Sequence, residues 1–128
     1  MNLLLDTHIL LWAAYQPDRL SPAARDRLED QQNTLWFSAV SIWEVAIKRG
    51  LGRADFSIDP GPLRTGLLSS EYRELAFESH HCLGLGTLPE LHNDPFDRIL
   101  VAQTAFEGMV LLTADRKVAQ YGGPAELI

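Results

Sequence analysis

Cysteine is nearly absent from this sequence of 128 residues, because Cys82 is the only one. A single cysteine excludes a disulfide within the chain and is typical of a reducing compartment, so we expect a cytoplasmic location. The chain also lacks the C-x-x-C and H-x3-H spacings of zinc sites, although His80, His81 and His92 lie near Cys82. These residues therefore do not predict a structural zinc ion.

Long hydrophobic runs are missing as well. No apolar stretch reaches the roughly 18 residues of a membrane-spanning helix, and we expect no membrane association. The apolar start, MNLLLDTHILLWAAY, lacks a basic leading segment and is interrupted by Asp6 and His8, which argues against a secretory signal peptide. With 46% hydrophobic and 22% charged residues, the composition predicts one globular domain over residues 1–128.

Positive charge is scarce, since 11 Lys and Arg stand against 17 Asp and Glu, for a net charge of −6. This balance predicts no strong non-specific affinity for nucleic acid. Setting aside the four acids discussed below leaves 13 acidic residues against 11 basic ones, a net charge of −2. The overall charge therefore neither supports nor excludes a small catalytic site for RNA.

Strand-like segments alternate with helix-like segments along the chain. Short apolar runs predict strands at 2–5, 35–38, 74–77 and 109–113, with a further edge strand at 126–128. Periodicity, caps and stop signals predict helices at 9–14, from Ser21-Pro22 onward, at 42–50, 63–72, 81–85, 96–107 and 116–121. The alternation indicates an α/β fold, which we expect to be a three-layer α/β/α sandwich around a mainly parallel sheet of four to five strands.

Four carboxylates stand where an apolar strand ends or a helix begins: Asp6, Glu44, Asp97 and Asp115. In an open parallel sheet the carboxyl ends of the strands meet in one crevice, so acids far apart in sequence converge there. Converging carboxylates repel one another unless a cation binds, and hard oxygen ligands suit Mg²⁺ or Mn²⁺. Because such a cation can drive phosphodiester hydrolysis, the pattern predicts a metal-dependent nuclease.

Two of these acids also have simpler explanations in the first half of the chain. Asp6 is a good N-cap for the helix that follows it. Ser41 and Glu44 have the spacing of a capping box, and Glu44 stands four residues before Lys48, which favours a salt bridge. Either explanation would account for Glu44 without a metal ion.

The two later acids are similarly ambiguous. Asp94 and Pro95 have the pattern of an N-cap followed by the first helical residue, which places Asp97 in the first turn, where the helix dipole favours an acid. We interpret Asp94 as the cap and Asp97 as the ligand. Asp115 could form an Asx turn, and Thr113 could orient Asp115, bind a water molecule or cap a helix.

Basic side chains beside the acids are candidates to hold phosphate, and Arg98 is the one we favour. Lys48, Arg49 and Arg53 follow Glu44 and have the same potential role. The ordinary alternative for such residues is a solvated helix face.

Histidine and tryptophan are expected to serve the structure. We expect His92 to brace the loop before Asp94, and His8 to pack beside the site. The three tryptophans fall on apolar faces of the expected elements, so we place them in the core: Trp12, Trp36 and Trp43. In the helix at 96–107, the expected buried repeat is Ile99, Leu100, Gln103 and Phe106.

Four blocks of sequence carry a resemblance that covers nearly the whole chain. They are LLLDTHILLW (3–12), FSAVSIWEVAIK (37–48), LPELHNDPFDRILVAQ (88–103) and LLTAD (111–115). In this order and spacing the blocks resemble the PIN-domain family, specifically the VapC-type toxin ribonucleases of toxin–antitoxin pairs.

The resemblance implies a PIN-like fold and an Mg²⁺-dependent or Mn²⁺-dependent endoribonuclease acting on single-stranded or loop regions of RNA. It assigns the acidic quartet of the family to Asp6, Glu44, Asp97 and Asp115. It also implies accessory roles for Thr7, Thr113 and Arg98. Members of the family usually form homodimers or hetero-oligomers with a cognate antitoxin, which blocks them. Asn93 departs from the family pattern, because many relatives have a basic residue there, and this puts one phosphate contact in doubt.

The sequence leaves two other functions open. Receiver domains and haloacid-dehalogenase-like phosphatases also place acids at parallel strand ends, but they carry an acidic pair with a late lysine or a D-x-D motif. Here Asp6 is followed by Thr7-His8 instead. The second alternative is a non-catalytic binding module, in which the acids only cap helices and form salt bridges.

Overall fold

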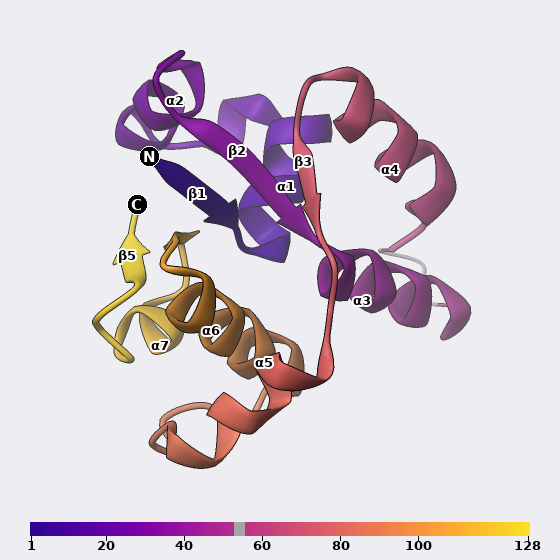
Figure 1. The fold of residues 1–128 in the computed structure, drawn as a ribbon. Coiled ribbons are helices and arrows are strands. Elements are labelled where there is room, and N and C mark those ends of the chain that lie inside the picture. The colour runs from indigo at the N-terminus through magenta and orange to yellow at the C-terminus, as the bar shows by residue number, and fades with distance from the viewer. Residues whose placement is uncertain (53–55) are drawn as a thin grey trace.

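The computed structural model describes residues 1–52 and 56–128 of the chain. Its centre is a sheet of five strands in the order β3-β2-β1-β4-β5, and each described pair of neighbours is parallel (Figure 1). The strands are β1 (Asn2–Leu5), β2 (Thr34–Ser38), β3 (Arg73–Leu75), β4 (Val110–Thr113) and β5 (Ala125–Leu127). The predicted α/β fold with a parallel sheet is confirmed.

Helices connect the strands and cover the sheet. The described part of the chain contains α1 (Thr7–Tyr15), α2 (Pro22–Glu29), α3 (Ala39–Gly50), α4 (Pro60–Ser69), α5 (Ser79–Leu83), α6 (Pro95–Glu107) and α7 (Arg116–Ala119). Two short 3-10 helices, η1 (Pro17–Arg19) and η2 (Gly84–Thr87), follow α1 and α5. No helix among the described residues is both long enough and apolar enough to span a bilayer.

Two apolar clusters lie on opposite faces of the sheet and define its layers. Successive strand residues point to opposite faces, so Leu4 belongs to one cluster and Leu5 to the other. The Leu4 cluster includes residues of α6 and α7, and the Leu5 cluster includes residues of α1, α2 and α4. Helix α3 contributes to both, with Val40 in the first cluster and Val45 in the second. The carboxyl ends of the central strands are therefore bordered by α1, α3 and α6 (Figure 1).

Helix α3 begins three residues earlier than the sequence predicts. Strand β2 runs directly into the helix, and the Oγ of Ser38, its last residue, accepts a hydrogen bond of 3.0 Å from the Val40 amide. Ser41 is a fully buried residue inside the helix rather than its cap. The predicted capping box of Ser41 and Glu44 is therefore wrong, and Ser41 is available for other contacts.

Two predictions about the core are also wrong. Phe106 is 61% exposed near the end of α6, where its ring stacks on that of His80 with the ring centroids 4.3 Å apart. Trp43 is 49% exposed, because the buried face of α3 is formed by Val40, Glu44 and their neighbours. Its ring instead packs edge-on against that of Phe96, with the ring centroids 4.9 Å apart.

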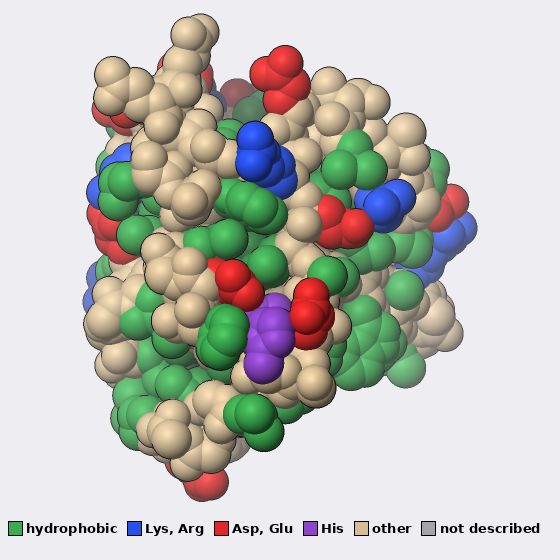
Figure 2. Space-filling view, viewed as in Figure 1, with side chains coloured by type: hydrophobic (Ala, Val, Ile, Leu, Met, Phe, Trp, Pro, Cys, Tyr) green, Lys and Arg blue, Asp and Glu red, His purple; other side chains and the backbone are tan. Residues whose placement is uncertain are grey.

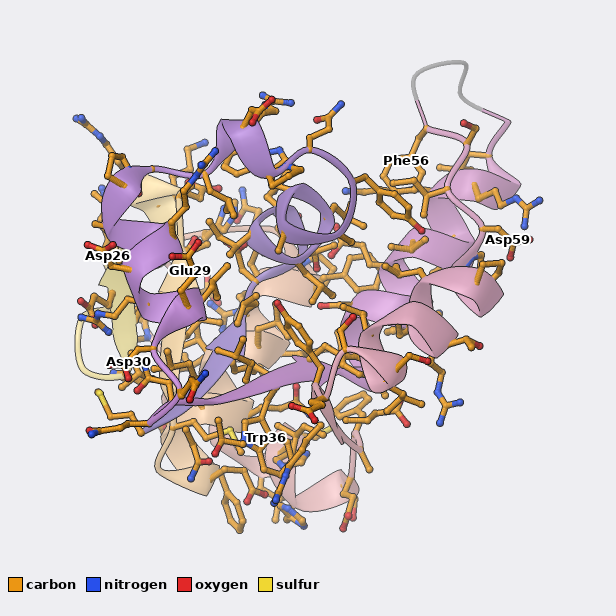
Figure 3. All side chains as sticks on the ribbon, turned by 90° about the horizontal axis from the view of Figure 1, so that it is seen from above. Asp26, Glu29, Asp30, Trp36, Phe56 and Asp59 are labelled. Carbon is orange, nitrogen blue, oxygen red and sulfur yellow. The ribbon has the colours of Figure 1, made fainter. Side chains whose placement is uncertain are left out.

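The other two tryptophans pack against the core as expected. Trp36 lies on the α6 side of the sheet, away from α1 and α2, and its Nε1 donates a 3.0 Å hydrogen bond to Asn2 (Figure 3). Trp12 is partly buried against the Leu5 cluster.

Candidate metal centre at the carboxyl ends of the strands

Asp6 directly follows β1 and is only 2% exposed. Its Oδ1 accepts a 2.8 Å hydrogen bond from the Ile9 amide, which makes it the N-cap of α1, and its Oδ2 accepts a hydrogen bond from Thr113. Burial raises the pKa of Asp6 above its ordinary value, although these two hydrogen bonds oppose the change. An ionised carboxylate at this position is costly unless a cation compensates its charge.

Glu44 reaches the same region from the buried face of α3. Its Oε1 accepts a 2.7 Å hydrogen bond from Thr7, whose hydroxyl also lies 2.9 Å from that of Ser41. Its Oε2 lies 2.6 Å from the Nζ of Lys48, so the predicted salt bridge is confirmed. The hydroxyls of Thr7 and Ser41 thus form a buried polar cluster that fixes Glu44 against α1.

Asp97 lies in the first turn of α6, as the sequence predicts. Asp94 is the N-cap, because its Oδ1 accepts hydrogen bonds from the amides of Phe96 at 2.9 Å and Asp97 at 3.4 Å. Burial, followed by the charge of Asp94, raises the pKa of Asp97 from 3.8 to about 6, with smaller contributions from Asp6 and Glu44. A hydrogen bond of 2.8 Å between Oδ2 of Asp97 and Nε2 of His92 acts in the opposite direction.

Asp115 caps the short helix α7, where its Oδ1 accepts a 2.8 Å hydrogen bond from the Lys117 amide. Its own amide donates a 3.0 Å hydrogen bond to Oγ1 of Thr113. Thr113 therefore links two acids, because the same hydroxyl donates to Asp6. The other oxygen of Asp115, Oδ2, lies 3.9 Å from Nε2 of His92.

The four acids lie close enough for their charges to act on one another. The charges of Asp6 and Glu44 act on Asp97, and the charge of Asp115 acts on Asp6. A separate group of acidic and histidine side chains is seen on the surface over α5 and α6 (Figure 2). Carboxylate oxygens from four separate elements are a donor set that fits Mg²⁺ or Mn²⁺.

One group of neighbouring ligand atoms at this site includes a single member of the quartet. Among the described residues at this site, the group of ligand atoms within 4.8 Å of one another consists of His92, Asp94 and Asp97. Asp6 and Glu44 are bonded to Thr113 and Lys48. Each of these carboxylate oxygens retains lone-pair capacity for a cation.

Arg98 uses its guanidinium within the protein. It donates hydrogen bonds of 3.0 Å to the Pro89 carbonyl and to the Tyr121 hydroxyl, with a longer one of 3.4 Å to the Leu85 carbonyl. These bonds fasten the segment before His92 to α6. A phosphate contact by Arg98 stays a prediction, and sequence reasoning missed this bracing role because Tyr121 lies 23 residues away.

The remaining basic candidates are also paired or lie outside the described residues. Arg49 forms an ion pair of 3.1 Å with Asp59, and Lys48 is bound to Glu44. Arg53 falls within 53–55, outside the described residues.

A second cluster, of His80, His81 and Glu107, lies between α5 and α6. Nδ1 of His81 accepts a 3.0 Å hydrogen bond from the Glu78 amide, so the ring proton lies on Nε2, which is 3.0 Å from Oε1 of Glu107. The hydrogen bond from His81 lowers the pKa of Glu107. In this arrangement His81 has no free lone pair for a metal ion, and Cys82 is exposed outside the cluster.

The fold and the acidic centre define a class of α/β proteins with acids at the carboxyl ends of parallel strands. The sequence model of the PIN domain matches residues 3–124, so the chain belongs to the PIN domain family. The chain is similar to Ribonuclease VapC22 of Mycobacterium tuberculosis, with 29% identity over 126 residues that cover 96% of this chain and 94% of the relative.

Solved structures share the fold. VapBC2 from Rickettsia felis, bound to a DNA fragment from its promoter, contains a chain that matches with a TM-score of 0.73 at 17% identity, covering 99% of this chain and 98% of that one. A toxin-antitoxin complex from Klebsiella pneumoniae matches with a TM-score of 0.61 at 18% identity, over 97% and 95% of the two chains. The family resemblance seen in the sequence is confirmed, and the receiver-like and phosphatase-like alternatives are not favoured.

Proposed function

We propose that this chain is an Mg²⁺-dependent or Mn²⁺-dependent endoribonuclease, and that it acts as the toxin of a toxin–antitoxin pair. The observation that carries the proposal is the meeting of acids from four separated segments, two of them almost fully buried, with raised pKa values at Asp6 and Asp97. Buried acids without compensating charge destabilise a protein, and their arrangement at strand ends is best explained by a cation. Family membership and the similarity to a protein named a ribonuclease support the same reaction class.

The proposed residues have two kinds of role, binding the metal ion and orienting its ligands. Asp6 and Asp97 would hold the principal ion, and Glu44 and Asp115 would complete its shell, hold a second ion or orient the attacking water. Thr113 and Thr7 keep Asp6 and Glu44 in fixed orientations through their hydroxyl groups. When bound, a divalent cation supplies Lewis-acid chemistry by polarising the scissile phosphate and stabilising charge on the attacking and leaving oxygens.

A cognate antitoxin and a second copy of the chain are the proposed partners. The cluster of four acids would accept a basic side chain of an antitoxin, and similar folds occur in the VapBC2 and Klebsiella pneumoniae complexes. In solution we expect a homodimer, or a hetero-oligomer when the antitoxin is present. Co-expression of the antitoxin should abolish RNA cleavage.

RNA-end mapping tests the proposed function in cells. Induction of the wild type should create new RNA ends at defined positions, whereas Asp6→Ala should create none at equal protein levels. Identical ends in the two samples would remove the case for a nuclease. Circular dichroism of the purified variant checks that the loss does not come from unfolding.

A further inference from the structure

We propose that His92 is a nitrogen ligand of the metal centre, and that it biases the centre toward Mn²⁺ over Mg²⁺. This inference rests on the proposed metal-dependent function and adds to the acidic quartet a ligand of a different chemical class. It concerns direct binding of the ion by the imidazole, as distinct from the bracing of a loop that the sequence predicts for this residue.

The position of Nε2 of His92 between two acids is the first observation. The atom lies 2.8 Å from Oδ2 of Asp97 and 3.9 Å from Oδ2 of Asp115, so one ring faces acids carried by two different helices. Nε2 or Nδ1 of His92 and one oxygen each of Asp94 and Asp97 form a group of possible ligand atoms within 4.8 Å of one another. An ion with bonds of about 2.1 Å can join atoms up to about 4.2 Å apart, which includes both distances at Nε2 of His92.

The absence of a protein partner at Nδ1 of His92 is the second observation. Among the described residues, no protein group hydrogen-bonds to Nδ1, whereas Nε2 is hydrogen-bonded to Asp97. A cation can replace this hydrogen bond by taking the Nε2 lone pair while the ring proton is carried on Nδ1. His81 provides the contrast, because its Nδ1 accepts from the Glu78 amide and its Nε2 must keep the proton. Of these two histidines, each close to carboxylates, only His92 can adopt the tautomer that a metal ion requires without losing a backbone hydrogen bond at Nδ1.

The ring of His92 is also held in place. Its side chain is only 15% exposed. Arg98 fastens the preceding segment through the Pro89 carbonyl, and the Leu91 amide donates a 3.0 Å hydrogen bond to the same carbonyl. Asp94 then fixes the start of α6. A ligand positioned by a braced loop needs little ordering when an ion binds.

An imidazole ligand predicts that the centre prefers Mn²⁺ over Mg²⁺. Mg²⁺ takes oxygen ligands and gives up its waters reluctantly. Affinity for sites that include nitrogen rises along the first transition series from Mn²⁺ onward, so an imidazole favours Mn²⁺ over Mg²⁺. Without His92, the remaining ligands are all oxygens and the difference between the two ions shrinks.

Electron spin echo envelope modulation of Mn²⁺ bound to the full chain, without RNA, tests the proposal directly. We expect a ¹⁴N modulation from a directly bound imidazole in the wild type, and its loss in His92→Gln. Glutamine keeps an amide donor for Asp97, so a role limited to bracing would leave Mn²⁺ binding unchanged. As a ligand substitution, His92→Gln should weaken Mn²⁺ binding about tenfold or more and Mg²⁺ binding much less. The matched control, His80→Gln, removes a histidine outside the centre and should keep the signal and the affinity.

The outcomes separate this proposal from the function on which it rests. Stoichiometric Mn²⁺ binding without nitrogen coupling would overturn the role of His92 and leave the acidic centre standing. Absence of Mn²⁺ binding in the wild type would overturn both. Equal losses of Mn²⁺ and Mg²⁺ affinity in His92→Gln would contradict the proposed preference.

Discussion

Two buried threonine hydroxyls each hold one of the most deeply buried acids of the centre. Thr113 is bonded to Asp6 and Thr7 to Glu44, and all four side chains are buried. A carboxylate with a fixed hydrogen bond cannot rotate freely, so its remaining lone pairs keep one orientation. We therefore propose these threonines as positioning residues, a role that neither strand pattern nor helix periodicity could reveal.

The substitution Thr113→Val tests this positioning. It keeps the shape of the side chain but removes the donor to Asp6 and the acceptor for the Asp115 amide. We expect Mg²⁺ affinity and the rate of RNA cleavage to fall about ten- to a hundredfold, as for other groups that orient metal ligands. Cleavage of a labelled RNA across a magnesium titration measures both quantities. Thr113→Ser restores the hydroxyl and should recover most of the loss, whereas wild-type behaviour of the valine variant would contradict the role.

The raised pKa of Asp97 predicts that the metal-free protein becomes less stable as pH rises. Burial and the charge of Asp94 raise this pKa from 3.8 to about 6, so the folded state binds the proton more tightly than the unfolded chain. The resulting contribution to the free energy of unfolding is largest below pH 3.8, is lost as pH rises to about 6, and stays absent above it. Asp97→Asn removes this dependence.

Above pH 6 we expect Asp97→Asn to stabilise the metal-free protein by on the order of 1–2 kcal/mol, after allowance for the partial exposure of the carboxylate. Thermal unfolding in EDTA from pH 4 to 8 should show a difference between variant and wild type that is near zero at the acid end and grows with pH. A variant that is less stable than the wild type at pH 8 would contradict the claim that the ionised Asp97 carboxylate destabilises the folded protein.

Sequence reasoning located Asp6, Asp97 and Asp115 because each lies near the end of a strand or the start of a helix. Glu44 lies inside α3, so it does not have the position at the helix start that the sequence suggested. Sequence reasoning correctly identified Asp94 as the N-cap of α6, because cap geometry depends on neighbours in the chain. It could not foresee the contacts of His92 and Arg98. Those contacts depend on Asp97, Asp115 and Tyr121, and only the folded packing of α6 against α7 brings these residues together.

At the scale of elements, the junction between β2 and α3 decides how the centre is built. Ser38 and Ser41 are equally good caps by composition, and only the register of the sheet makes Ser38 the last strand residue and the first helix cap. With the helix starting there, the Ser41 and Glu44 side chains both point inward and contact the hydroxyl of Thr7. The existence of both elements was predictable, but their boundary was not, because it is set by tertiary packing.

Gln103 ties three elements together inside the core. Its Oε1 accepts a 2.6 Å hydrogen bond from Ser38, and its Nε2 lies 3.4 Å from both the Ala76 carbonyl and Nδ1 of His81. Gln103→Leu keeps the volume but leaves the buried Ser38 hydroxyl without this acceptor. We expect a loss of about 1–3 kcal/mol in the free energy of unfolding.

Urea unfolding measures this effect, and a double-mutant cycle with Ser38→Ala supplies the control. If the Ser38–Gln103 bond is the cause, the double variant should lose clearly less than the two single losses combined. Full additivity would show that the two side chains stabilise the protein independently. Because Ser38 caps α3, the same variants also report how firmly the Glu44 helix is held.

At the scale of the molecule, the alternation of strands and helices was enough to predict a parallel sheet covered on both faces. The order of the strands, β3-β2-β1-β4-β5, depends on long-range pairing that local patterns do not encode. This order puts β1 next to both β2 and β4, so the residues at or just beyond their carboxyl ends supply Asp6, Thr113 and the start of α3. The acidic net charge of −6 is thus partly concentrated where a cation can offset it.

The most direct test of the metal centre compares two neighbouring acids of α6. Asp97→Asn should lower Mg²⁺-dependent RNA cleavage by about a thousandfold or more with the fold intact, because it removes a principal ligand. Asp94→Asn keeps a capping side chain and should retain cleavage within about tenfold of the wild type. Mg²⁺-dependent cleavage at the wild-type rate by purified Asp97→Asn would contradict the account, as would an Asp94→Asn variant that is equally inactive.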